Sequence, residues 1–159
     1  MINGTQPYVV EFNARFGDPE TQVILPLIES DLGVILHSAV EGKLDATMMK
    51  LSRKTAVCVV MASAGYPGDY EKGKVIYGLQ DEKPESDTIV FQAGTIRNNA
   101  HFLTNGGRVL AVTALADNLE EAIAKAYKRI AEITFEGAYY RRDIGQKGLL
   151  RQKDLLEKI

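Results

Sequence analysis

A nearly unbroken apolar stretch at residues 55–62, TAVCVVMA, constrains the fold more than any other part of the sequence. It is rich in β-branched residues and has the length of an ordinary strand. A strand with one solvent-exposed face would alternate apolar and polar residues, and this stretch does not alternate. We therefore expect a central strand that is covered by other elements on both faces.

Shorter segments on both sides of this stretch predict an α+β fold. Turn residues such as Asn98-Asn99 and Asn105-Gly106-Gly107 separate short β-type runs, as in antiparallel hairpins. Strands are predicted at 8–13, 75–77, 88–93, 101–103 and 108–114. The order of the elements predicts a mostly antiparallel sheet with helices packed on one face.

Capping residues place the helices. Asp18 is a good N-cap before Pro19, so a short helix is expected to begin there. Asn118, with Glu121 three residues later, is typical of a capping box and predicts a longer helix. Further predictions are an end of the first helix at Pro26, a second helix from Ser30 or Asp31 to Gly42, and a loose helix near the end of the chain.

Composition narrows the class of protein. The 159 residues are enough for a real core, and 45% apolar with 25% charged residues is normal for a globular protein. The net charge of −2 argues against nucleic-acid binding as the main function. No apolar run approaches the about 20 residues of a membrane-spanning helix, and the start resembles no signal peptide. With Cys58 as its single cysteine, the chain is expected to be cytoplasmic.

The candidate metal-binding and anion-binding side chains are concentrated in residues 11–22, EFNARFGDPETQ. On a strand at 8–13, Glu11 and Asn13 would share one face, about 7 Å apart, and their oxygens would suit Mg²⁺. Arg15 would hold an anion beside the metal, and Asp18 and Glu20 add carboxylates at a helix start. An edge strand with a solvent-exposed face and an ordinary helix start would give the same pattern. Spacing alone leaves both interpretations open.

The same block resembles the closing metal-binding strand and the following turn of phosphoribosylamine–glycine ligases, which are ATP-grasp enzymes of purine biosynthesis. Three later stretches match that family in the same order, namely ASAGYPGDY at 62–70, TNGGRVLAVTALA at 104–116 and YYRRDIG at 139–145. The resemblance therefore extends to about residue 145. It implies the C-terminal α+β domain of such a ligase, preceded by the last strand of the ATP-grasp domain.

The resemblance also implies an activity and a set of roles. The full ligase joins 5-phosphoribosylamine to glycine and splits ATP to ADP and phosphate, through glycyl phosphate. Glu11 and Asn13 match the pair that binds Mg²⁺ or Mn²⁺, and Arg15 matches a catalytic arginine that steadies the acyl phosphate. Candidate substrate contacts are Asp18, Glu20 and Arg108, the last because a guanidinium suits a phosphate. The turn before Arg108 has a purely structural interpretation as well.

The matched stretches belong to one portion of the ligase. We expect residues 1–25 to be the terminal strand and turn of the ATP-grasp domain, and residues 26–159 to be the C-terminal domain. The N-terminal and ATP-grasp lobes would be the missing partners, so the chain alone is expected to be inactive. The turn signal Asn3-Gly4 fits either a short lead-in to the first strand or a partner strand that would precede Met1, and the resemblance implies the second.

One expectation follows from an incomplete ATP-grasp domain. An unpaired strand at 8–13 would fold back on the domain or pair with a neighbouring molecule. The alternative to a ligase fragment is a free-standing, non-catalytic binding or assembly module derived from that ligase.

Overall fold

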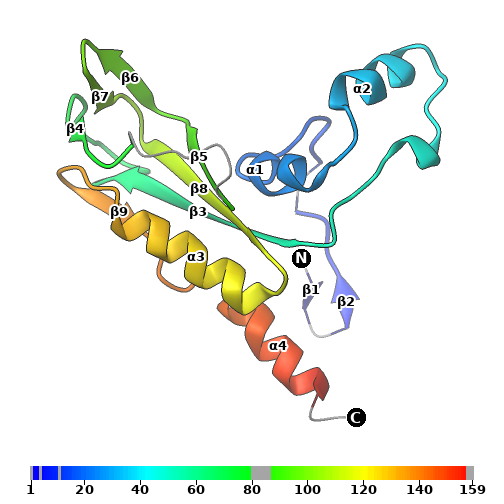
Figure 1. The fold of residues 1–159 in the computed structure, drawn as a ribbon. Coiled ribbons are helices and arrows are strands. Elements are labelled where there is room, and N and C mark those ends of the chain that lie inside the picture. Colours follow the sequence, from blue (N-terminus) through cyan, green and yellow to red (C-terminus); the bar gives the residue numbers. More distant parts are fainter. Residues whose placement is uncertain (1, 4, 11, 80–86, 157–159) are drawn as a thin grey trace.

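The computed structural model describes residues 2–3, 5–10, 12–79 and 87–156. These residues have an α+β fold in which the sheets are antiparallel, as predicted (Figure 1). The main sheet has the strand order β5-β8-β3-β9. Its members are β5 (Thr88–Gln92), β8 (Arg108–Ala116), β3 (Thr55–Ser63) and β9 (Ala138–Tyr140).

β3 is the central strand that the sequence predicts. It pairs with β8 along its length and with β9 at its C-terminal end. Met61 on β3 is opposite Tyr140 on β9, and the Tyr140 ring contacts that of Tyr127. Tyr127 belongs to helix α3 (Leu119–Ala131), so Met61 and its same-face neighbours Val57 and Val59 point toward α3. This face forms the core.

The long helix α3 covers the core face of the sheet (Figure 1). Ile123, Ala126 and Ile130 of this helix are buried against β3 and β8. Asn118 caps the helix, because its Oδ1 accepts from the N–H of Glu121 over 2.9 Å. The prediction of a helix opened by a capping residue and packed on one sheet face is therefore confirmed.

The opposite face of β3 is covered by a shorter element. Helix α1 (Thr21–Ile24) and the 3₁₀ turn η1 (Leu25–Leu27) pack on β3, and α1 also contacts β8. The hydroxyl of Thr113, a β8 residue on this face, donates to the carbonyl of Gln22 over 2.9 Å. Because helices lie on both sides of β3, its lack of polar alternation is explained.

A smaller sheet and a C-terminal helix complete the domain. The small sheet has the order β4-β7-β6, from β4 (Val75–Ile76), β7 (His101–Thr104) and β6 (Thr95–Asn98). Its β6–β7 hairpin turns at Asn99, which has a φ of 52°. The loose helix predicted at the end is α4 (Gln146–Leu156). No described helix is long and apolar enough to cross a membrane.

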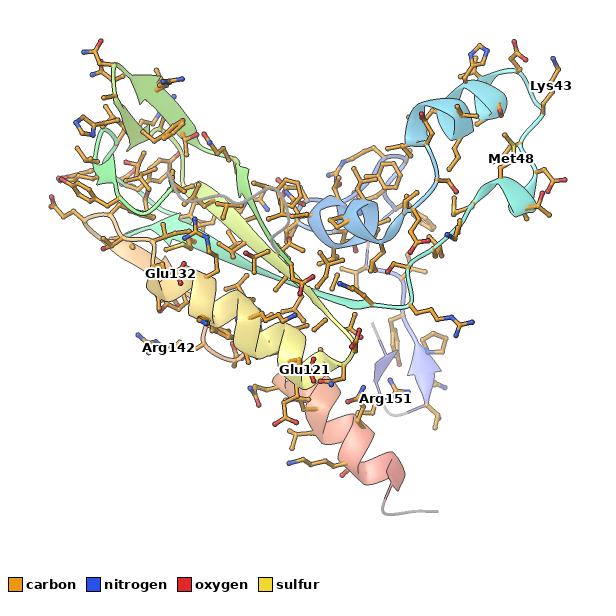
Figure 2. The ribbon with its side chains drawn as sticks, viewed as in Figure 1. Lys43, Met48, Glu121, Glu132, Arg142 and Arg151 are labelled. Atoms are coloured by element: carbon orange, nitrogen blue, oxygen red, sulfur yellow. The ribbon has the colours of Figure 1, made fainter. Side chains whose placement is uncertain are left out.

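Residues 28–52 form an arm that extends away from the sheets (Figure 1). The arm contains helix α2 (Leu32–Val40) and the 3₁₀ turn η2 (Ala46–Met48). Asp31 is the N-cap of α2, since its Oδ1 accepts from the N–H of Val34 over 3.1 Å. Figure 2 places Lys43 and Met48 at the outer end of the arm.

The described residues of 8–13 do not form the predicted strand, and this prediction is wrong. Residues 8–10 and 12–13 adopt no regular structure, whereas β1 (Ile2–Asn3) pairs with β2 (Gln6–Pro7) as a short hairpin. The expected hairpin is therefore closed by residues of this chain. A strand needs a neighbouring strand and a surface for its apolar side chains, but Phe12 is 92% exposed. Self-association through this segment stays a prediction.

The first helix also begins later than predicted. Residues 18–20 form turns, and α1 begins at Thr21, whose N–H and hydroxyl both donate to the carbonyl of Gly17. Asp18 therefore does not cap the helix, and its carboxylate is used elsewhere. Pro26 lies in the 3₁₀ turn that ends this segment, as predicted.

Candidate functional site

The sequence stretches that match the ligase family converge at the C-terminal end of β3. Ala62, in this end of β3, is opposite Arg108 of β8 on one side and Tyr139 of β9 on the other. Ser63 donates its hydroxyl proton to the carbonyl of Gly106 over 3.0 Å. Residues 62–70, 104–116 and 139–145 are therefore neighbours in space, although they are far apart in the sequence.

The N-terminal block joins this end of the sheet through an ion pair. Arg108 Nη2 lies 2.8 Å from Asp18 Oδ2, and Arg108 Nη1 donates to the carbonyl of Asp18 over 3.0 Å. Two of the three candidate substrate contacts thus bind each other. Both side chains are partly exposed, at 37% for Arg108 and 50% for Asp18.

A second contact holds the same block further along β8. Gln22 Nε2 donates to Asp18 Oδ1 over 3.1 Å, and the Gln22 carbonyl accepts from buried Thr113. The side-chain Oε1 of Gln22 is buried and has no hydrogen-bond partner among the described residues. The turn is therefore bound to β8 through Asp18, and α1 is bound to β8 through Gln22.

The GYPGDY loop at 65–70 packs on the turn before Arg108. A Cβ added to Gly107 would collide with the ring of Tyr66, so only glycine leaves room for that ring. The loop closes on itself, because Gly68 N–H donates to the Gly65 carbonyl over 2.8 Å. Its glycines therefore serve a tight turn in this structure.

The metal and catalytic predictions are only partly covered by the described residues. Glu11 lies outside the described residues, and Asn13 is exposed. Within the described part of the chain, no group of three or more His, Cys, Asp and Glu side chains is placed to hold a metal ion. Arg15 is exposed, and its Nη1 donates to the carbonyl of Phe16 over 2.8 Å. Glu20 folds back against Gly17. These roles stay predictions.

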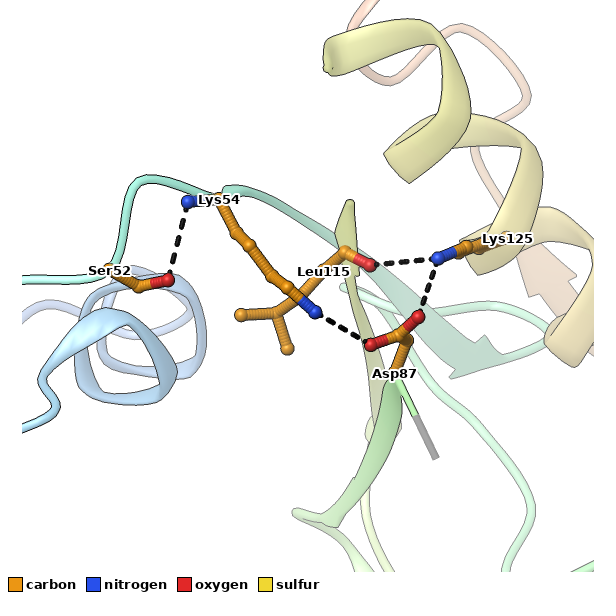
Figure 3. Close-up of polar contacts among 5 residues, drawn as sticks. All are labelled: Ser52, Lys54, Asp87, Leu115 and Lys125. Carbon is orange, nitrogen blue, oxygen red and sulfur yellow. Dashed lines mark hydrogen bonds and ion pairs between the residues drawn. The ribbon is translucent and has the colours of Figure 1, made fainter. Parts of the chain in front are cut away.

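Sequence reasoning missed a charged cluster at the other end of the sheet (Figure 3). Asp87 Oδ1 lies 2.9 Å from Lys54 Nζ, and its Oδ2 lies 2.6 Å from Lys125 Nζ. These hydrogen bonds, chiefly the one from Lys125, lower the pKa of Asp87 to about 2. The three residues come from a linker, a loop and a helix, so no local sequence pattern signals the cluster. It is a structural feature that joins β3, β5 and α3.

Cys58 is a half-buried residue of the central strand. It lies on β3 opposite Thr113, on the face covered by α1. Burial raises the pKa of its thiol, which leaves it protonated near neutral pH.

Comparison with known proteins identifies the family. Residues 56–147 match the family described as "Phosphoribosylglycinamide synthetase, C domain". The chain belongs to this C-domain family. The matched range begins in β3 and ends just after the 139–145 stretch, so it contains the main sheet, the small sheet and α3. The resemblance noted in the sequence is therefore confirmed.

The relatives of this C-domain chain are purine biosynthetic enzymes. A bifunctional purine biosynthetic protein of Dictyostelium discoideum is 54% identical over 142 residues, which are 89% of the chain and 17% of that protein. Phosphoribosylamine–glycine ligase of Chlorobaculum tepidum is 50% identical over 149 residues, 94% of the chain and 35% of that ligase. The trifunctional purine biosynthetic protein adenosine-3 of Homo sapiens is 49% identical over 153 residues, 94% of the chain and 15% of that protein.

The crystal structure of phosphoribosylamine–glycine ligase from Thermotoga maritima has the same fold. It superposes with a TM-score of 0.73 and 37% identity over 90% of this chain and 34% of that one. The chain thus spans about a third of the length of these single-function ligases. Because the match with the Chlorobaculum ligase covers 94% of the chain, it includes the 12–22 block as well as the C-domain range.

Proposed function

We propose that this chain is part of a phosphoribosylamine–glycine ligase, which makes glycinamide ribonucleotide from 5-phosphoribosylamine, glycine and ATP. The proposal is supported by the identity to named ligases over most of the chain. The structural observation that carries the proposal is the ion pair between Arg108 and Asp18. This ion pair joins the C-domain sheet to the block that resembles the metal-binding strand. We place the enzyme in the cytoplasm.

The proposed reaction has two steps. The glycine carboxylate attacks the γ-phosphorus of ATP, so that ADP leaves and glycyl phosphate forms. The amine of phosphoribosylamine then attacks the carbonyl carbon of glycyl phosphate, an amide forms, and inorganic phosphate leaves with loss of an amine proton. Both steps need positioning and charge neutralisation more than a protein nucleophile.

The residues of the N-terminal block suit these needs. Glu11 and Asn13 would hold Mg²⁺ or Mn²⁺, because carboxylate and amide oxygens are hard ligands and the exposed Asn13 is open to solvent. The ion would neutralise charge on the ATP phosphates when bound. The Arg15 guanidinium, which is also exposed, would hold the carboxylate of glycine and then its acyl phosphate. Glu20 remains a candidate substrate contact, whereas Asp18 and Arg108, the other two candidates, bind each other.

The domain organisation is part of the proposal. Residues 1–25 would complete the ATP-grasp domain, and residues 26–159 would form the C-terminal domain that closes one side of the active site. The nucleotide-binding lobes would then lie in the two thirds of the ligase that the chain does not match. The isolated chain would therefore be inactive.

Complementation tests this function. A chimera would consist of the Chlorobaculum ligase with its matching third replaced by this chain, expressed in a bacterial strain that lacks the ligase. We expect growth without added purines, and no growth when Glu11→Ala is introduced. A chimera that is made and folded but does not support growth would favour the non-catalytic module instead. Growth that survives Glu11→Ala would remove the metal assignment.

A further inference from the structure

We propose that Arg108 is a positioning residue that, together with Thr113, anchors the turn before α1 and so fixes the path of Asn13 and Arg15 into the active site. The inference rests on the proposed function, because that function assigns Asn13 to the metal ion and Arg15 to the acyl phosphate. It differs from the interpretation of Arg108 as a ligand of the substrate phosphate. The two interpretations predict different partners for the guanidinium.

The first support is an irregularity in the sheet that redirects Arg108. The pairing of β3 with β8 shifts between Met61 and Ala62, so that Met61 is opposite Leu110 whereas Ala62 is opposite Arg108. In a regular strand Arg108 would share a face with Leu110, which points toward α3. The bulge places Arg108 on the other face, where Asp18 lies.

The second support is that the anchor has two points on one strand. Arg108 binds both the carboxylate and the carbonyl of Asp18, over 2.8 and 3.0 Å. Thr113 lies on the same face of β8 and donates to the carbonyl of Gln22, over 2.9 Å. Gln22 in turn donates to Asp18. Two of these acceptors are main-chain carbonyls, so the contacts hold the backbone of the block and not only its side chains.

The third support is the charge around Arg108. The Asp18 carboxylate neutralises the guanidinium that faces the block, so a substrate phosphate would have to displace a carboxylate already in place. A guanidinium that binds one residue through both side chain and main chain is well suited to fixing a turn. Arg15 lies three residues before Asp18, so a displaced turn would displace it as well.

Hydrogen exchange on the isolated full chain tests the anchor without any activity. Arg108→Gln and Asp18→Asn are expected to increase exchange of the amides at 21–24 about tenfold each, and the double variant no further than either single variant. Arg97→Gln on the exposed β6 hairpin is the matched control and should leave these amides unchanged. Additive effects, or no effect of Arg108→Gln, would overturn the proposal.

Kinetics of the active chimera distinguish positioning from substrate binding. A positioning role predicts that Arg108→Gln and Asp18→Asn each lower kcat about tenfold while KM for phosphoribosylamine stays within about twofold. A rise in KM for phosphoribosylamine caused by Arg108→Gln but not by Asp18→Asn would make Arg108 a substrate ligand and contradict the proposal. A chimera without activity would refute the proposed function, whereas the exchange experiment would still decide the anchor.

Discussion

Asp87 accepts a hydrogen bond from Lys125 over 2.6 Å, and this contact links the start of β5 to the middle of α3. Lys125 also donates to the carbonyl of Leu115 over 3.4 Å, and Lys54 reaches the other carboxylate oxygen of Asp87 (Figure 3). One carboxylate therefore connects a helix, a loop and the strand that follows the arm. The acid stability of the domain should reflect this arrangement.

Acid should weaken the domain through Asp87. The folded-state pKa of this group is about 2, below its ordinary value of 3.8. The contribution of its two ion pairs to stability is therefore complete above pH 3.8 and is lost as the pH falls toward 2. Thermal unfolding of the wild type between pH 5 and 2 should show a steeper fall in Tm than Asp87→Asn, which cannot titrate. Asp69→Asn in the exposed loop is the control, and equal slopes for wild type and Asp87→Asn would contradict the assignment.

Two leucines should respond differently to truncation. Leu110 of β8 is 0% exposed in the core beneath α3, whereas Leu36 on the arm is 50% exposed. Leu110→Ala should lower the free energy of unfolding by about 2–5 kcal/mol, because it removes buried contacts and leaves a cavity. Leu36→Ala should change it by about 0.5 kcal/mol. Urea denaturation measures both, and similar losses would mean that the arm packs on the domain in solution.

Substitutions at two glycines with positive φ distinguish the stability cost of backbone strain from that of a steric clash. Gly42 has a φ of 68° with nothing within 4 Å of an added Cβ, whereas Gly78 has a φ of 83° and its Cβ would collide with the Glu132 carbonyl. Gly42→Ala should therefore cost about 1 kcal/mol of stability, and Gly78→Ala about 2 kcal/mol more. Urea denaturation of both variants tests this order. Equal losses would show that the turn after β4 moves freely away from Glu132.

The isolated chain should bind nucleotide poorly. Under the proposed function, the adenine and phosphate pockets lie in the part of the ligase that this chain does not match. Titration calorimetry with Mg·ADP should therefore detect no binding stronger than about 1 mM. A dissociation constant near about 1 μM would mean that this chain itself contains a nucleotide pocket.

Much of the C-domain could be predicted because its signals are local. The apolar run at 55–62 predicted the central strand, and Asn118 with Glu121 predicted the start of α3. The β9 strand was not predicted, because three residues paired only to the end of β3 have no pattern of their own. The Asp87 cluster was missed for a related reason, since it forms only when distant segments meet.

The N-terminal block shows the limit of sequence patterns. Residues 8–13 have the composition of a strand, but that composition describes a segment that fits a sheet surface, and no described strand lies beside it. Asp18 has the pattern of an N-cap, yet Arg108 and Gln22 use its carboxylate. The bulge that redirects Arg108 depends on the register between β3 and β8, which sequence alone does not determine.

The most direct test of the central claim is the turnover of the purified chimeric ligase with Glu11→Gln. Glu11→Gln preserves the size of the side chain but removes the charge that Mg²⁺ would contact. If Glu11 and Asn13 hold the ion at the ATP phosphates, kcat for glycinamide ribonucleotide formation should fall by at least about 100-fold, and nearly as far with Asn13→Ala. A variant Glu11→Gln enzyme that keeps the kcat of the unaltered chimera would contradict the account.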